Sequence, residues 1–143
     1  MNIVDILVKK KIVEEREIPA LKKEIAEAGG DIESVLLKRG VPSAEIFATK
    51  AEMFGIPVRS LEGQNIPFEI LKFIPEEAAA NYHVVPLGIT DNTLEVGIVD
   101  PDNIDARDAV NFISSKINHP YKFFLITAED FERVLEMYKG IHG

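Results

Sequence analysis

Cysteine is absent from this chain of 143 residues. Its absence excludes disulfide bonds and thiolate metal sites, which fits a reducing compartment. No apolar run approaches the roughly 18–20 residues that a helix needs to cross a bilayer. The start, Met1–Asp5, lacks the basic and apolar regions of a secretory signal. The sequence therefore predicts a soluble cytoplasmic module without direct membrane insertion.

Basic residues are also in short supply. The chain has 16 lysines and arginines but 24 aspartates and glutamates, which gives a formal net charge of −8. Most of the imbalance lies in residues 56–143, which hold 7 basic and 14 acidic side chains, whereas residues 1–55 hold 9 and 10. Because nucleic-acid binding normally requires a basic surface for phosphate contacts, we expect no nucleic-acid partner.

Signatures of catalysis and of cofactor binding are missing as well. The sequence contains no Gly-x-x-x-x-Gly-Lys-Ser/Thr phosphate loop and no Gly-x-Ser-x-Gly elbow. Residues 100–105 depart from the EF-hand spacing, and we interpret them as a turn followed by a helix cap. The three histidines are scattered along the chain, and no cysteine completes a zinc site. We therefore predict no catalytic residue, no cofactor and no metal ion.

The N-terminal part of the chain is helical in its periodicity and repeats itself. Residues 3–13 align without gaps on residues 32–42, at a shift of 29. Each copy is an amphipathic helix, a basic pair and an apolar pair, so we interpret the segment as two helical hairpins that share a core. Gly40 is the expected residue after the helix of the second copy, and Ser43 is the expected N-cap of the next helix.

The remainder of the chain alternates between helical and strand patterns. In order, we expect helices opened by Pro67 and Pro75, strands 83–89 and 94–99 joined by a turn at Asp91–Asn92, a helix capped by Asp102 or Asn103, a strand 121–126, and a helix opened by a capping box at Thr127–Asp130.

Together these patterns predict an α+β fold in three parts. Residues 1–55 form a helical lobe built from the tandem repeat, and residues 56–66 form a connector with extended character. Residues 67–143 form a small ααββαβα lobe, in which a three-stranded sheet is packed by helices.

Two basic clusters occupy matching places in the repeats: Lys9, Lys10 and Lys11 in the first copy, and Lys38 and Arg39 in the second. Each lies at or just past a helix C-terminus, where a cation interacts favourably with the helix dipole. The structural role and a partner-binding or anion-binding role both remain open. If the clusters bind a partner, charge reversal at the three lysines weakens docking.

The second half of the chain resembles a known family. A strand that contains Pro-Leu (Val84–Leu87) is followed by an L-x-V strand (Leu94–Val96) and then by an Asp-Pro turn (Asp100–Pro101). Gly55–Pro57 precedes all three. This order is similar to that in the N-terminal domains of the ATPases that power type II secretion and type IV pilus assembly.

The resemblance implies a non-catalytic adaptor domain, joined to the ATPase core of its own chain. Such a domain docks the motor onto the cytoplasmic domain of an inner-membrane platform protein, and so lies at the periphery of the bacterial inner membrane. Whether the motor serves secretion or pilus assembly stays open.

Some members of that family bind cyclic di-GMP through two copies of the helical repeat. Each copy begins with Arg-Leu-Gly, has a glycine midway and ends near a glutamine. Here the copies begin with Asn2–Val4 and Asp31–Glu33, Lys11 replaces the first midway glycine, and Met53 replaces the second glutamine. The carboxylates of Asp31 and Glu33 would repel a bis-phosphate. We therefore expect the repeat to be retained and the nucleotide site to be lost, with a cyclic di-GMP-binding regulatory domain as the alternative.

Overall fold

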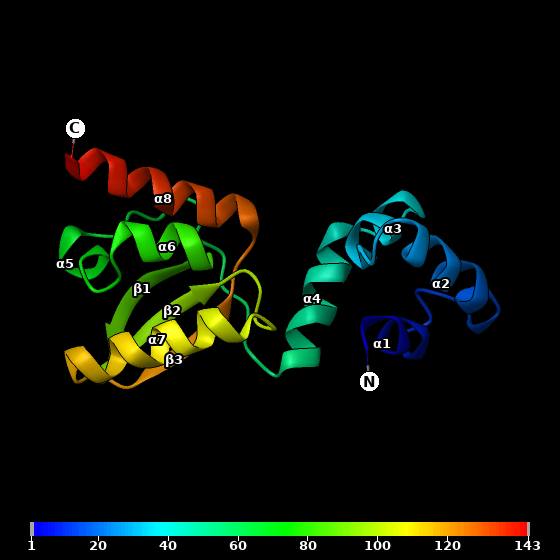
Figure 1. Cartoon of the computed structure of the whole chain (residues 1–143), viewed down its shortest axis with the longest axis horizontal. Coiled ribbons are helices and arrows are strands. Elements are labelled where there is room, and N and C mark those ends of the chain that lie inside the picture. Colours follow the sequence, from blue (N-terminus) through cyan, green and yellow to red (C-terminus); the bar gives the residue numbers. More distant parts are fainter. Residues whose placement is uncertain (1, 143) are drawn as a thin grey trace. The chain divides into compact units, whose positions relative to one another are not determined.

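A computed structural model describes residues 2–142 of the chain. The chain divides into two compact units, Met1–Gly55 and Ile56–Gly143. We call them the helical unit and the sheet unit, and describe each by itself (Figure 1).

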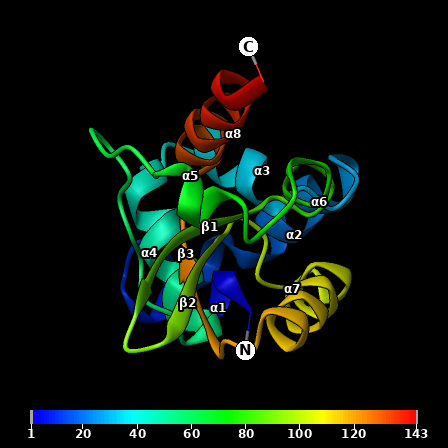
Figure 2. The ribbon, with the colours of Figure 1, turned by 90° about the vertical axis from the view of Figure 1, so that its left-hand side faces the viewer.

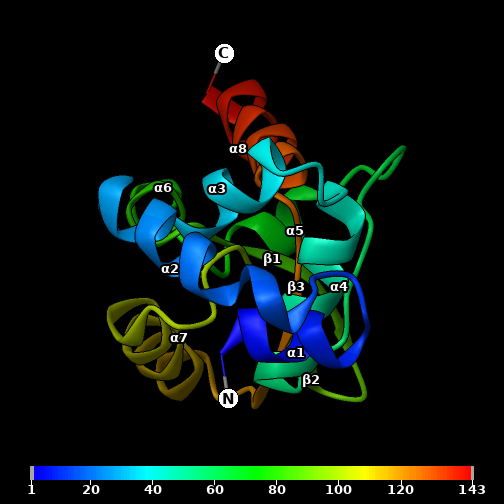
Figure 3. The same ribbon diagram turned by 90° about the vertical axis from the view of Figure 1, so that its right-hand side faces the viewer.

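The described part of the helical unit consists of four α-helices and one 3₁₀ turn, namely α1 (Ile3–Lys9), η1 (Glu15–Glu17), α2 (Ile18–Glu27), α3 (Ile32–Lys38) and α4 (Ser43–Phe54). Helix α1 packs against α4, and α2 packs against α3 (Figure 3). Their apolar faces share one core, in which Leu7, Leu21 and Leu36 are fully buried. Each helix is too short to be stable alone in water, so this common core holds the unit together.

One helix start differs from the prediction. The N-cap of α4 is Pro42, which makes no side-chain capping bond, and Ser43 is already the first helical residue. The prediction was wrong because proline, with its fixed φ, provides the extended residue from which a helix can begin. The expected end of the preceding helix is confirmed, since Gly40 follows α3 with a positive φ of 89°.

The sheet unit contains, within residues 56–142, α5 (Phe68–Leu71), α6 (Glu76–Tyr82), β1 (Val84–Thr90), β2 (Thr93–Ile98), α7 (Ile104–Ile117), β3 (Tyr121–Leu125) and α8 (Ala128–His142). The strand order is β1-β2-β3 (Figure 1, Figure 2). Strand β1 is antiparallel to β2, and β2 is parallel to β3, to which it is connected through α7. The predicted α+β fold with a three-stranded sheet is confirmed.

Local signals predicted the hairpin turn well and the start of β1 less well. Asp91 and Asn92 have φ values of 51° and 65°, as a tight hairpin turn requires. His83 was expected to open the strand, but it caps α6 with a left-handed φ of 55°, and β1 begins at Val84.

Aromatic side chains of β3 point alternately to the two faces of the sheet. Phe123 lies 5.7 Å from the guanidinium of Arg107 on α7. The next residue, Phe124, lies 3.9 Å from the guanidinium of Arg59, which belongs to the connector. Successive strand residues point to opposite faces, so α7 covers one face and the connector contributes to the other.

The connector, residues 56–66, is bonded to β3 and to α8. The backbone N–H of Leu125 donates to Pro57 (2.8 Å), and that of Arg59 donates to Leu125 (3.0 Å). Further along, the N–H of Leu61 donates to the buried carboxylate of Asp130 at 2.9 Å. The first two bonds place the connector along the β3 edge of the sheet, and the third joins it to α8.

The start of α8 forms one half of the predicted capping box. The Thr127 hydroxyl accepts from the N–H of Asp130 at 3.1 Å. The Asp130 carboxylate does not return a bond to Thr127 among the described residues; it accepts from Leu61 and from Arg133. The box was overpredicted because a long-range contact recruits this side chain.

Candidate functional site

The helical repeat is the candidate site, and its two copies begin with the same hydrogen bond. The side chain of Asn2 accepts from the N–H of Asp5 (3.0 Å), and the side chain of Asp31 accepts from the N–H of Ser34 (3.1 Å). These are N-caps, which satisfy donors that the first turn leaves unpaired. Asn2 and Asp31 stand at the positions where the similar family has arginine, and in this chain they serve as helix caps.

The two copies also end with the same turn. The N–H of Lys11 donates to Val8 and the N–H of Gly40 donates to Leu37, both at 3.0 Å. The backbone is left-handed at both positions, with φ of 65° at Lys11 and 89° at Gly40. The repeat seen in the sequence is thus a repeat of backbone geometry, and Lys11 occupies a position that favours glycine.

The second lysine of the first basic cluster contacts the other repeat. The Lys10 ammonium donates to the fully buried hydroxyl of Thr49 at 3.1 Å and lies 3.3 Å from a carboxylate oxygen of Glu52. Both partners belong to α4. This lysine therefore ties α1 to α4.

Arg39, at the equivalent position of the second cluster, makes the reciprocal connection. Its guanidinium forms two hydrogen bonds of 2.9 Å with Glu24 on α2, and a third of 3.0 Å with Glu17. The bidentate bond from the guanidinium holds the pKa of Glu24 below its ordinary value. The planar guanidinium can donate two parallel hydrogen bonds to one carboxylate, whereas a lysine ammonium acts as a point charge and lacks this fork of donors.

We call these two contacts the reciprocal clasps. In each, the cation that ends the short helix of one repeat reaches the long helix of the other, as Lys10 does with α4 and Arg39 with α2. Sequence comparison of the repeats located both cations. It missed their partners, because Glu17, Glu24, Thr49 and Glu52 lie at positions that do not match between the two copies.

The other predicted site residues are exposed at helix ends. Lys9 lies in the last turn of α1 and Lys38 in the last turn of α3, where both complement the helix dipole. Lys11 is also exposed. The structure therefore divides the predicted clusters: Lys10 and Arg39 stabilise the unit, whereas Lys9, Lys11 and Lys38 present their charges to solvent.

A cavity of about 280 Å³ lies between α2 and α3, and its charged lining is Glu24, Glu27 and Lys38. Two carboxylates against one ammonium do not favour a phosphate. Among the described residues, no group of three or more acidic, histidine or cysteine side chains could hold a metal ion. Within the same residues, no helix is both long enough and apolar enough to cross a membrane.

Comparison with known families gives a match over the whole of the sheet unit. A family model described as the MshEN domain matches residues 54–143. A curated relative, the type IV pilus assembly ATPase PilB of Myxococcus xanthus (strain DK1622), is 25% identical over 111 residues. The alignment covers 77% of this chain but 20% of PilB, so the chain spans about a fifth of that relative.

Solved structures share the fold over nearly the whole chain. A structure of MshE with cdg has a TM-score of 0.85 at 18% identity, covering 96% of this chain and 99% of that chain. The N-terminal domain of XpsE has a TM-score of 0.65 at 22% identity, covering 94% and 92%. These matches confirm the predicted fold class, and with the family match they confirm the predicted resemblance.

Proposed function

The chain belongs to the MshEN domain family, and on that basis we propose that it is a non-catalytic adaptor domain of a secretion or pilus assembly motor ATPase. In this role it docks the motor onto the cytoplasmic domain of an inner-membrane platform protein. It is joined to the ATPase core of its own chain and works at the cytoplasmic side of the bacterial inner membrane, held there by its partners.

The reciprocal clasps are the observation that supports docking most strongly. A receptor for a bis-phosphate nucleotide needs cations that can turn toward the ligand. Here Arg39 is bonded to Glu24 and Glu17, and Lys10 to Thr49 and Glu52. These charges are therefore engaged within the unit, where they add to the apolar core, and this suits a rigid body that transmits force between a motor and its anchor.

The exposed lysines provide a test of the docking surface. We predict that the double substitution Lys9→Glu and Lys38→Glu weakens binding to the platform protein's cytoplasmic domain roughly tenfold, because charges at an interface govern encounter and orientation. The affinity is measured by calorimetry or by biolayer interferometry at low and at physiological salt. Lys10 and Arg39 are left unchanged, since their loss would disturb the clasps.

The matched control is the double substitution Lys22→Glu and Lys23→Glu, which changes the net charge equally at two exposed residues of α2. Binding that both double variants retain, or that both lose equally, would rule out the proposed basic surface. No binding by the unmodified chain would rule out the docking function itself.

A cyclic di-GMP-binding regulatory domain is the second candidate. The observation that favours it is the match to MshE, which was solved with cdg, across both repeats of this chain. Against it stand Lys11 in place of the first midway glycine and Asp31 at the start of the second copy. Titration with the nucleotide separates the two candidates.

A further inference from the structure

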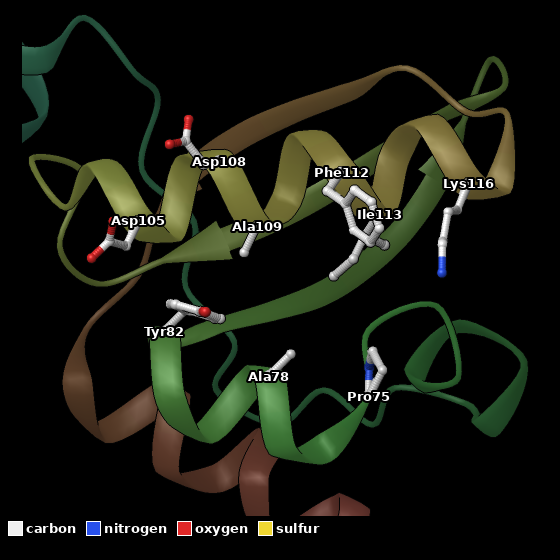
Figure 4. Close-up of a pocket in the computed structure, with 9 residues that line it drawn as sticks. All are labelled: Pro75, Ala78, Tyr82, Asp105, Asp108, Ala109, Phe112, Ile113 and Lys116. Atoms are coloured by element: carbon white, nitrogen blue, oxygen red, sulfur yellow. The ribbon is translucent and has the colours of Figure 1, made fainter.

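Helices α6 and α7 of the sheet unit face each other across a groove of about 570 Å³ (Figure 4). The apolar side chains that line it include Ala78 and Tyr82 from α6, and Ala109, Phe112 and Ile113 from α7. The α7 residues that reach the groove follow helical spacing, so they form one stripe along the helix. We call this feature the α6–α7 groove.

Phe112 is the exposed apolar centre of the stripe. Its side chain is 61% exposed, whereas Val110 and Ser114 on the opposite side of α7 are buried in the unit. The Lys116 ammonium lies 4.9 Å from its ring. Phe112 therefore contributes little to the core of the unit. Aromatic side chains are enriched at protein interfaces, where they serve as anchors.

The two ends of the groove carry opposite charges. Asp105 and Asp108 line one end, near the start of α7, and Lys116 lines the other (Figure 4). Neither aspartate has an ion-pair or hydrogen-bond partner for its side chain among the described residues. Two unpaired carboxylates at the edge of an apolar groove are complementary to a cationic group on whatever binds there.

We infer that the α6–α7 groove is the docking site for an amphipathic helix of the platform protein's cytoplasmic domain, with apolar anchors on one face and basic residues toward its C-terminal end. Such a helix lies antiparallel to α7: its basic end meets Asp105 and Asp108, and an acidic N-terminal turn meets Lys116. This placement of charges also agrees with the helix's own dipole. From Asp105 to Lys116, α7 rises about 16 Å at ~1.5 Å per residue, so the groove accepts about three turns of helix.

The charge of the sheet unit favours a partner over a second copy of this chain. Residues 56–143 hold 7 basic and 14 acidic side chains. A second copy would bring the same excess of acid to an acidic rim, whereas a basic helix is attracted to it. A helix that docks into a groove contacts it through apolar side chains at helical spacing. The apolar stripe of α7 has the same spacing, so it can pack against such side chains.

This inference rests on the proposed docking function, and the test keeps the two separate. The full chain is titrated with the platform protein's cytoplasmic domain, using the variants Phe112→Asp and Asp108→Lys. Each has a matched control: Phe68→Asp replaces another exposed phenylalanine, 55% exposed, and Glu132→Lys reverses an exposed acid on α8. We expect both groove variants to weaken binding roughly tenfold or more and both controls to bind within about twofold of the unmodified chain.

Circular dichroism of all four variants confirms that each is folded before its affinity is used. If the unmodified chain binds and the groove variants bind equally well, the groove is not the docking site although the docking function stands. If the unmodified chain does not bind, the docking function fails and the groove's role fails with it. If sedimentation shows a dimer of the unmodified chain that Phe112→Asp dissociates, a second copy occupies the groove, and this also overturns the inference.

Discussion

At the scale of single residues, Lys11 shows that the repeat has kept its backbone while changing its chemistry. It holds a left-handed φ of 65°, as Gly40 does at 89° in the other copy. A side chain in this region is strained by about 1 kcal/mol or more, and the chain tolerates that strain. The turn therefore does not require glycine in order to form.

The strain at Lys11 can be measured. We predict that Lys11→Gly raises the free energy of unfolding by about 0.5–1 kcal/mol, because relief of strain outweighs the added flexibility of the unfolded chain. In the matched change, Gly40→Ala lowers it by about 1 kcal/mol through backbone strain alone, since only its own chain neighbours lie within 4 Å of where the alanine Cβ would stand. Urea unfolding compares the three proteins. A Lys11→Gly protein that is less stable than the unmodified chain would contradict this account.

The ion pair between Arg59 and Glu95 provides a prediction that depends on pH. Two bonds of 3.1 Å join the guanidinium to the carboxylate, and they hold the pKa of Glu95 below its ordinary value of 4.5. The stability that the pair contributes is therefore fully present above about pH 4.5, and it is lost as the pH falls through the lower, folded-state pKa. The protonated form of Glu95 does not gain this stability, because it carries no charge to pair with Arg59.

We predict that Glu95→Gln is less stable than the unmodified chain by about 1–2 kcal/mol at pH 7, and that this gap closes as the pH falls below 4.5. Urea midpoints between about pH 7 and pH 3 measure the gap. Glu136→Gln is the control, since Glu136 pairs with Lys139 and its side chain is 67% exposed, so it contributes little. A gap that stays constant across this range would show that Glu95 acts through packing and not through charge.

At the scale of elements, the sequence predicted what local chemistry determines. The Asp91–Asn92 turn and the Asn103 cap of α7 depend on residues within a few positions of each other, and both were expected. The parallel pairing of β2 with β3 was not specified, because it depends on how α7 crosses the sheet. The bond between Leu61 and Asp130 spans 69 residues, and no local pattern signals it.

That long-range bond is the element-scale prediction. We expect Asp130→Ala to lower the free energy of unfolding by about 1–3 kcal/mol, because the buried N–H of Leu61 loses its acceptor. Arg133→Ala removes the exposed partner of the same carboxylate and should cost less than about 0.5 kcal/mol. Hydrogen exchange at the Leu61 amide should accelerate in the first variant alone. Equal protection of this amide in both variants would rule out the proposed role of Asp130.

At the scale of the whole molecule, the sequence identified the family and the repeated basic residues. It did not show which of these basic residues are bonded within the unit and which are exposed. Lys10 and Arg39 lie beside Lys9 and Lys38 in the chain, yet one pair is bonded within the helical unit and the other is exposed. The groove was missed for a related reason. A helical period indicates which residues of α7 face the core, such as Val110, but it does not show that Phe112, on the opposite side, lies beside α6.

We propose that this MshEN domain keeps the repeat and has lost the nucleotide site. Calorimetric titration of the full chain with cyclic di-GMP, alongside a domain known to bind it, tests the claim most directly. We predict no detectable heat while the control binds, because Asn2 and Asp31 cap helices where the similar family has arginine, and Arg39 and Lys10 are held in the reciprocal clasps. Binding at low micromolar or tighter affinity would contradict the account and make the chain a second-messenger sensor.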